Sequence, residues 1–382
     1  MEESKYLKLI DEELSMLPTY VREFYISNNH AVTTAYQYLT EIRRFFEWLR
    51  SSKISDAKNN KEISLNTLEN LRRNDVLLYV DFLQRQVNKQ GKLNTSSSIN
   101  RSLNALRSLF HYLTVIADSN NGEPYFYRNV MQKVKSLKNS ETLNYRAHQI
   151  EAHMLTGDLK YQFIDYIKND YINTLNNYGK HYFKLNKERD IAIIALLLAT
   201  GIRVSECANS NINQINLNDS NLDVLRKGGQ KDTVPIADWA LPYLSDYLKI
   251  RKQRYNPEEN EKALFLATTR GKTNRISSNS IENFVGKYSK AFGHPLTPHK
   301  LRHTLASEIY AVTKDQVLVA QQLGQKGTSA TDLYTHVDQN KQKEALATIS
   351  KQYPSGNKKS ILDWDAFFVC KPMNIILPLV TI

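Results

Sequence analysis

The chain has very little cysteine: only Cys207 and Cys370 among 382 residues. Two thiols exclude a disulfide framework and a cysteine-rich zinc site. Long apolar runs are also missing, since the longest clean one, residues 191–199, is far too short to span a bilayer. The first thirty residues contain several acidic side chains and no secretory leader pattern. We therefore expect a protein of the reducing cytoplasm that has no membrane partner.

The charge balance is strongly basic. Lys and Arg total 51 against 39 acidic residues, a net charge of +12. This excess favours a polyanionic partner, either nucleic acid or an anionic membrane surface. A basic protein with no such partner remains an alternative on charge alone. With 41% hydrophobic residues the chain can bury at least one core, and its length suggests two or three domains.

Residues 1–130 read as a mostly helical domain. Apolar residues recur at helical spacing over 34–50 and again over 99–113. Three serines at 96–98 are candidates to cap the second of these helices. Arg101 and Arg107 lie off its apolar face, so they can contact DNA or simply be solvated.

A second domain is expected at 149–352, after a basic, weakly periodic linker at 131–148. A helix is predicted over 189–200, followed by short strands at 214–217, 222–225 and 232–236. The segment 226–230, RKGGQ, reads as a hairpin tip. Helices are predicted again beyond Leu241. The apolar tail 353–382 either packs on a neighbouring subunit or has little consequence. The predicted fold class is mainly α with a small antiparallel β-sheet.

Three short segments carry candidate chemistry. ATGIRVSE, residues 199–206, places Arg203 three residues before Glu206. PHKLRHT, residues 298–304, places His299 and Arg302 on one helical face, and His303 is expected to point elsewhere. LGQKGTSATDLYTHV, residues 323–337, contributes Gln325 and Tyr334. Each segment alone is weak, because 22 tyrosines occur in the chain and surface His–Arg pairs are common.

Together these residue types suit cleavage of a phosphodiester without a metal. Such a reaction needs an oxygen nucleophile, cations for the non-bridging oxygens, a proton acceptor and a proton donor. Arginine suits the phosphate oxygens, since its planar fork binds them in pairs and stays charged.

The order of the segments resembles the tyrosine recombinase, or phage integrase, family. That family has a TGxRxSE-like segment, a lysine on a β-hairpin, HxxR, a Leu-Gly-His/Trp turn and a tyrosine in a YTHV-like segment. Here they fall, in that order, at Arg203, Lys227, His299 with Arg302, Gln325 and Tyr334. TTAYQYLTEIRRFFEWL in the first domain is similar to the opening helix of the family's core-binding domain.

The resemblance implies a role for each position. Tyr334 corresponds to the nucleophile, and Arg203 and Arg302 to the phosphate clamp. His299 corresponds to a phosphate hydrogen-bond donor and proton acceptor for the tyrosine. Lys227 corresponds to the general acid, with Lys231 as its rival. A supporting role falls to Glu206, and no cofactor or metal is implied.

Gln325 departs from the family pattern, because most members have His or Trp there. Its amide can donate a hydrogen bond to a phosphate oxygen but cannot shuttle a proton. QQLGQ and TDLYTHV are most similar to the Xer type, in the branch where one protein acts without a second recombinase.

The resemblance also implies a two-domain clamp around DNA, with a SAM-like helical core-binding domain and an α+β catalytic domain. The implied partners are double-stranded DNA with a specific site, a homotetramer on two sites, and a septal DNA translocase of the FtsK type. The implied function is resolution of chromosome dimers at a dif-like site through a Holliday junction. Alternatives are a mobile-element integrase, a topoisomerase-like nicking and closing protein, and a non-catalytic DNA-binding protein.

Overall fold

The computed structural model describes residues 2–87, 91–119, 121–138, 141–151, 153–226, 229–325, 327–328, 331–335 and 346–349. It divides into two compact units, Met1–Thr142 and Leu143–Ile382. The boundary falls within the stretch 131–148, where the sequence predicts the linker. The tail 353–382 lies outside the described residues.

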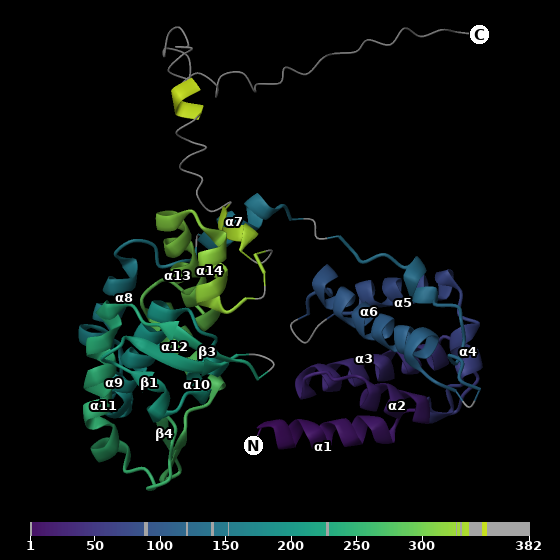
Figure 1. The fold of residues 1–382 in the computed structure, drawn as a ribbon, viewed down its shortest axis with the longest axis horizontal. Coiled ribbons are helices and arrows are strands. Elements are labelled where there is room, and N and C mark those ends of the chain that lie inside the picture. The colour runs from purple at the N-terminus through teal and green to yellow at the C-terminus, as the bar shows by residue number, and fades with distance from the viewer. Residues whose placement is uncertain are drawn as a thin grey trace, which may run out of the picture. The chain divides into compact units, whose positions relative to one another are not determined.

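The first unit is helical and has its own apolar core (Figure 1). Helix α3 packs against both α1 and α6, and the spacing of Leu39, Ile42, Phe46 and Leu49 explains why: all four lie on one face and are buried. The elements are α1 (Glu2–Ser15), α2 (Thr19–Ser27), α3 (Val32–Ser51), α4 (Leu65–Glu69), α5 (Arg73–Arg85), α6 (Ser96–His111), the π-helical turn η2 (Tyr112–Ile116), and the 3₁₀ turns η1 (Asn60–Glu62) and η3 (Val130–Lys133).

The start of α6 differs from the prediction. Thr95, not one of the serines 96–98, is the N-cap, and its hydroxyl accepts a hydrogen bond from the backbone N–H of Ser98 at 3.2 Å. The three serines form the first helical turn instead. A threonine with extended backbone immediately before them satisfies the same free N–H groups, so the cap lies one residue earlier.

The second unit is built around α9 (Asn177–Thr200). Its last twelve residues, 189–200, are all buried, because most of them are apolar and α8, α11 and α13 pack against α9. The sequence predicts only that half, since the first half is polar and begins at the Asn176 cap. Around it lie α7 (Leu143–Glu151), α8 (Leu159–Asn169), η4 (Tyr171–Thr174), α10 (Val204–Asn209), η5 (Ile212–Gln214), η6 (Asp238–Ala240), α11 (Leu241–Tyr255), α12 (Ser278–Ala291), α13 (Pro298–Thr313), α14 (Gln316–Leu323) and α15 (Asp332–Thr335).

A three-stranded antiparallel sheet has the order β1 (Ile215–Asn216), β2 (Asn221–Leu225), β3 (Lys231–Pro235). The β2–β3 register pairs Leu225 with Lys231, which places the predicted hairpin tip between them. The expected small antiparallel sheet is thereby confirmed.

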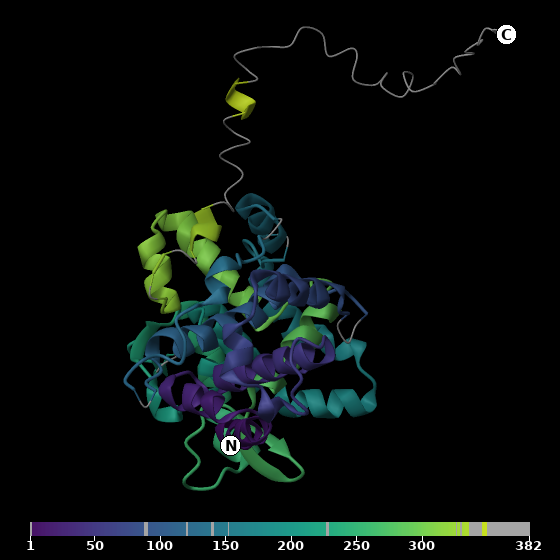
Figure 2. The ribbon, with the colours of Figure 1, turned by 90° about the vertical axis from the view of Figure 1, so that its right-hand side faces the viewer.

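A second hairpin, β4 (Leu266–Thr269) with β5 (Lys272–Arg275), was not anticipated, so the prediction of helices alone beyond Leu241 is wrong there. Its strands are four residues long and largely polar, so they lack apolar alternation. Their turn has positive φ at Arg270 (51°) and Gly271 (76°), as a two-residue hairpin loop requires. The hairpin lies at the lower edge of the unit in both views (Figure 1 and Figure 2). Within the described part of the chain, no helix has the length and apolarity to cross a membrane.

Gly201 ends α9 in the left-handed conformation, with φ 65°. A Cβ there would lie 2.9 Å from Leu323 Cδ2 and 3.1 Å from Leu305 Cδ2. We expect Gly201→Ala to lower the free energy of unfolding by about 2–4 kcal/mol, from backbone strain plus overpacking. Gly293, with φ 85° and open space around its Cβ position, is the matched control.

Gly293→Ala should cost only the backbone part, about 1–2 kcal/mol. Denaturant unfolding of both variants measures the difference. Equal losses would contradict a packing role for Gly201.

Candidate functional site

Arg203 lies three residues beyond the end of α9, as the N-cap of α10. Its backbone N–H donates to Glu206 Oε2 at 2.8 Å, and its Nη1 donates to Glu206 Oε1 at 2.7 Å. The Glu206 side chain is 4% exposed and that of Arg203 is 38% exposed. A buried carboxylate therefore holds an arginine whose remaining N–H groups reach solvent.

Arg302 is the buried member of the arginine pair, in the second turn of α13. Its Nη1 donates to Gly201 O at 2.5 Å and its Nη2 to Leu323 O at 2.7 Å. Burial lowers the pKa of Arg302 to about 10, and the nearby charge of Arg203 adds to this effect. The guanidinium is still cationic at neutral pH.

Arg203, His299 and Arg302 line one cavity of about 600 Å³. Thr297, Pro298 and Ser205 form part of its wall. Burial lowers the pKa of His299, and the charges of Arg302 and Arg203 lower it further. Three of the predicted residues thus meet at one cavity, to which His299 brings an uncharged imidazole at neutral pH.

Tyr334 lies in α15 and is 3% exposed. Its phenol group forms a 2.6 Å hydrogen bond with Nδ1 of His303. The ring packs in a small apolar cluster of Ala306, Val319 and Leu323. The structure therefore shows Tyr334 held inside the unit, next to the cavity helix α13.

The expectation that His303 points away from the site is wrong. His299 and His303 are four residues apart, so both lie on the face of α13 that meets α15, and their ring centroids are 4.5 Å apart. That i, i+4 spacing is visible in the sequence and is the signal that could have identified His303.

Protonation at this contact follows from burial. Burial raises the pKa of Tyr334 to about 12, although Arg302 partly opposes the rise. Burial lowers the pKa of His303 to about 4, with His299, Arg302 and Lys300 adding to the shift. At neutral pH the phenol is protonated and the imidazole is neutral, so the O–H donates to Nδ1 and the proton stays on Tyr334.

Lys227 and Gln325 are the two remaining site candidates. Lys227 lies outside the described residues, and its rival Lys231 begins β3 as an exposed residue. Gln325 follows Gly324 at the end of α14, and its N–H donates to Ala320 O at 2.9 Å. Its side-chain Oε1 is buried and has no hydrogen-bond partner among the described residues.

The two arginines predicted to contact DNA from α6 are not equivalent. Arg101 is exposed. Arg107 is half-buried, donating to Asn104 Oδ1 at 2.7 Å and to Val134 O at 3.1 Å. Arg107 thus joins α6 to the segment after η3, and Arg101 is the freer of the two to meet a phosphate.

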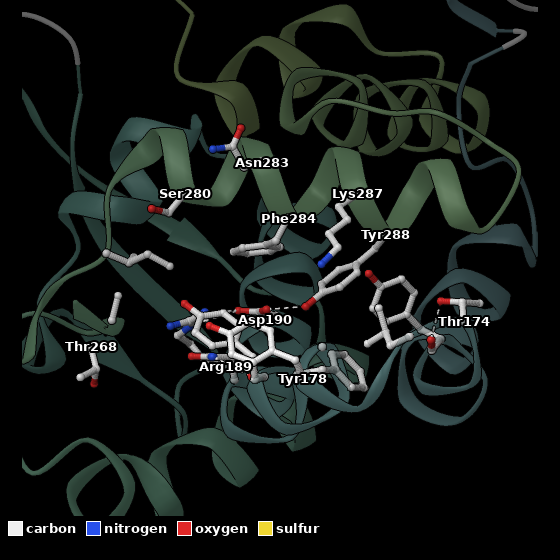
Figure 3. Close-up of a pocket in the computed structure, with 18 of the residues that line it drawn as sticks. Thr174, Tyr178, Arg189, Asp190, Thr268, Ser280, Asn283, Phe284, Lys287 and Tyr288 are labelled. Atoms are coloured by element: carbon white, nitrogen blue, oxygen red, sulfur yellow. Dashed lines mark hydrogen bonds and ion pairs between the residues drawn. The ribbon is translucent and has the colours of Figure 1, made fainter. Parts of the chain in front are cut away.

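A second cavity, of about 630 Å³, lies between α9, α12 and β4 and contains none of the predicted site residues (Figure 3). At its base Arg189 Nη2 meets Asp190 Oδ1 at 2.6 Å, and the Tyr288 hydroxyl donates to Asp190 Oδ2 at 2.6 Å. These buried polar groups satisfy one another, so the pair supports the packing of α12 on α9.

Comparison with known proteins identifies the class. Residues 165–341 match the phage integrase family. The chain is 48% identical over 355 residues to tyrosine recombinase XerS of Streptococcus thermophilus, covering 91% of this chain and 99% of that protein. XerS of Streptococcus agalactiae is 46% identical over 353 residues, with the same coverage.

Solved structures share the fold. The XerH site-specific recombinase in a post-cleavage complex with palindromic difH substrate gives a TM-score of 0.59 at 18% identity, covering 83% of this chain and 79% of that chain. A lambda integrase dimer bound to a COC′ core site gives 0.53 at 16% identity, covering 84% and 94%. The mainly helical fold predicted from the sequence is confirmed, and it is that of an integrase. The chain belongs to the phage integrase family and is a tyrosine recombinase.

The His303 pKa makes stability depend on pH. The unfolded imidazole takes up a proton below about 6.5, whereas the folded one resists until about 4. The unfolded state therefore binds more protons in this window, and the free energy of unfolding falls as the pH falls, by about 3 kcal/mol from this group. His303→Phe should remove that contribution.

Urea unfolding at several pH values between 4 and 7 measures the slope in wild type and in His303→Phe. A shallower slope in the variant is expected. Identical slopes would show that His303 does not carry the shift.

Proposed function

We propose that Tyr334 cleaves one DNA strand by attacking a phosphorus atom, while Arg203 and Arg302 clamp the non-bridging oxygens. The observation that supports this most is the shared cavity of Arg203, His299 and Arg302. Tyr334 lies on α15, which packs against the helix α13 that carries His299 and Arg302. Guanidinium groups fixed by Glu206 and by backbone carbonyls are oriented before the substrate arrives. Such preorganisation favours the charge that develops in the transition state.

The chemistry balances without an external energy source. A bond forms between the Tyr334 oxygen and phosphorus, and the bond from phosphorus to the 5′ oxygen breaks. The phenol loses its proton to the neutral imidazole of His299, and the 5′ oxygen gains one from Lys227. The 3′-phosphotyrosyl link retains the energy of the broken bond, so attack by a 5′ hydroxyl reverses the step and rejoins DNA.

The remaining residues support this step. His299 donates a hydrogen bond to the phosphate and stands ready as a proton acceptor, as expected from the sequence. The Gln325 amide contributes a hydrogen bond and no proton transfer. Because Tyr334 is almost fully buried, α15 must shift for its oxygen to reach a phosphate in the cavity.

We further propose that the chain acts on a specific site in double-stranded DNA as a homotetramer, through a Holliday junction. The net charge of +12 supports a DNA partner, and lambda integrase has been solved as a tetramer bound to a Holliday junction. The role that we propose is resolution of chromosome dimers at a dif-like site in the cytoplasm, with a septal translocase of the FtsK type as a partner. The likeness to XerS and the structure of XerH on difH substrate support recombination at such a site. In this role Arg101 contacts the DNA from α6.

Tyr334→Phe should abolish covalent complex formation. The test uses a nicked suicide DNA that carries the site, with EDTA present, and resolves the complex by denaturing gel. Wild type should accumulate the complex, because the short fragment that carries the 5′ hydroxyl dissociates at the nick and cannot rejoin. Tyr310→Phe is the matched control, since Tyr310 packs against the same apolar cluster. A covalent complex with Tyr334→Phe would exclude it as the nucleophile.

Arg203→Ala should slow cleavage by about 100–1000-fold, because it removes donors aimed at the transition-state charge. DNA affinity should change far less, since we expect many other Lys and Arg side chains to contact the DNA phosphates. Single-turnover cleavage rates and gel-shift titrations separate the two quantities. A rate within a few-fold of wild type would remove Arg203 from the clamp.

A further inference from the structure

Arg226, at the end of β2, uses all three of its guanidinium nitrogens. Its Nε donates to Asp232 Oδ2 at 2.9 Å, its Nη1 to Glu206 Oε2 at 2.9 Å, and its Nη2 to Gln322 O at 3.3 Å. The side chain is 6% exposed. One buried cation therefore joins the hairpin to α10 and to the end of α14.

The contact with α14 requires a glycine. A Cβ on Gly324 would lie 2.3 Å from Arg226 Nε and 2.5 Å from its Cζ. The guanidinium thus lies directly against the backbone that leads to Gln325. The neighbouring carbonyl, Leu323 O, accepts from Arg302, so two buried arginines hold adjacent carbonyls at this helix end.

The contact with α10 reaches Arg203 through one carboxylate. Glu206 Oε1 binds Arg203, and Glu206 Oε2 binds Arg226. Without Arg226 the carboxylate would lose its second cation but keep both of its bonds to Arg203. Arg203 therefore stays oriented when Arg226 is replaced.

Arg226 also closes the hairpin that carries the proposed general acid. Its N–H donates to Gln230 O at 2.8 Å, and its carbonyl accepts from Gly229 N–H at 3.0 Å. Lys227 is the next residue in the chain. The contacts of Arg226 therefore hold the backbone from which the chain continues to Lys227.

We propose that Arg226 is a positioning residue: by fixing the β2–β3 hairpin to α10 and α14, it orients the general acid that this hairpin carries. This rests on the proposed function, in which Lys227 protonates the leaving 5′ oxygen. Arg226 does not touch the substrate in this proposal. Replacing it should therefore slow the step that the general acid assists, which is protonation of the leaving 5′ oxygen.

The test compares two suicide substrates, one ordinary and one with sulfur in place of the leaving 5′ oxygen. In the second, the phosphorus–sulfur bond breaks and the thiolate departs without needing a proton. Arg226→Met, which keeps the buried stem and removes the charge, should cleave ordinary DNA about 100-fold more slowly. On the sulfur substrate most of that loss should disappear, as it should for Lys227→Ala.

Two control variants complete the experiment. Arg203→Ala should stay slow on both substrates, because the clamp is needed whichever atom leaves. Arg251→Met removes another buried arginine, bonded to the carbonyls of Leu264 and Ala263 away from the cavity. It should lower the melting temperature and leave the ratio of the two rates unchanged.

An equal loss on both substrates for Arg226→Met, with Lys227→Ala rescued, would overturn the proposal and leave Arg226 a purely structural residue. Rescue of Arg226→Met but not of Lys227→Ala would keep the positioning role and move the acid to another residue, such as Lys231. If Arg226→Met does not fold, Arg226→Lys replaces it, since one ammonium cannot make all three contacts. Its smaller loss on ordinary DNA should likewise vanish on the sulfur substrate, and an unrescued loss counts against the proposal in the same way.

Discussion

The catalytic unit depends on the buried guanidinium of Arg302 and its two carbonyl partners. Gly201 O ends α9 and Leu323 O ends α14, so one side chain ties two helix ends to α13. Helix C-termini carry partial negative charge, which offsets part of the cost of burying this cation. Arg203 follows Gly201 by two residues, and Gln325 follows Leu323 by two. Fixing these two carbonyls therefore fixes the backbone positions of Arg203 and Gln325.

Burial gives this site its electrostatic character. It lowers the pKa values of Arg302, His299 and His303 and raises that of Tyr334. The arginine remains charged, whereas both imidazoles are neutral at physiological pH. Tyr334 is kept protonated against His303, and its burial in the apolar cluster disfavours ionisation of the phenol.

The sequence predicts the residues of the site better than their contacts. Arg203, His299 and Arg302 were predicted from the order of short motifs that resembles the family, and the structure brings these three to one cavity. The role of Arg226 depends on Gly324, about a hundred residues away, and no local pattern reports that approach. The contact of His303 depends on where α15 docks. The β4–β5 hairpin was missed because its polar strands show no apolar alternation.

Gln325 is an amide where most of the family has His or Trp, so this position contributes no titratable group. Arg302 keeps its charge near neutrality, and His299 and His303 have lowered pKa values. The protonation of these three groups is therefore nearly constant between about pH 7 and 8, well above the ordinary histidine pKa of about 6.5. A change in the cleavage rate across that interval must come from groups other than these three.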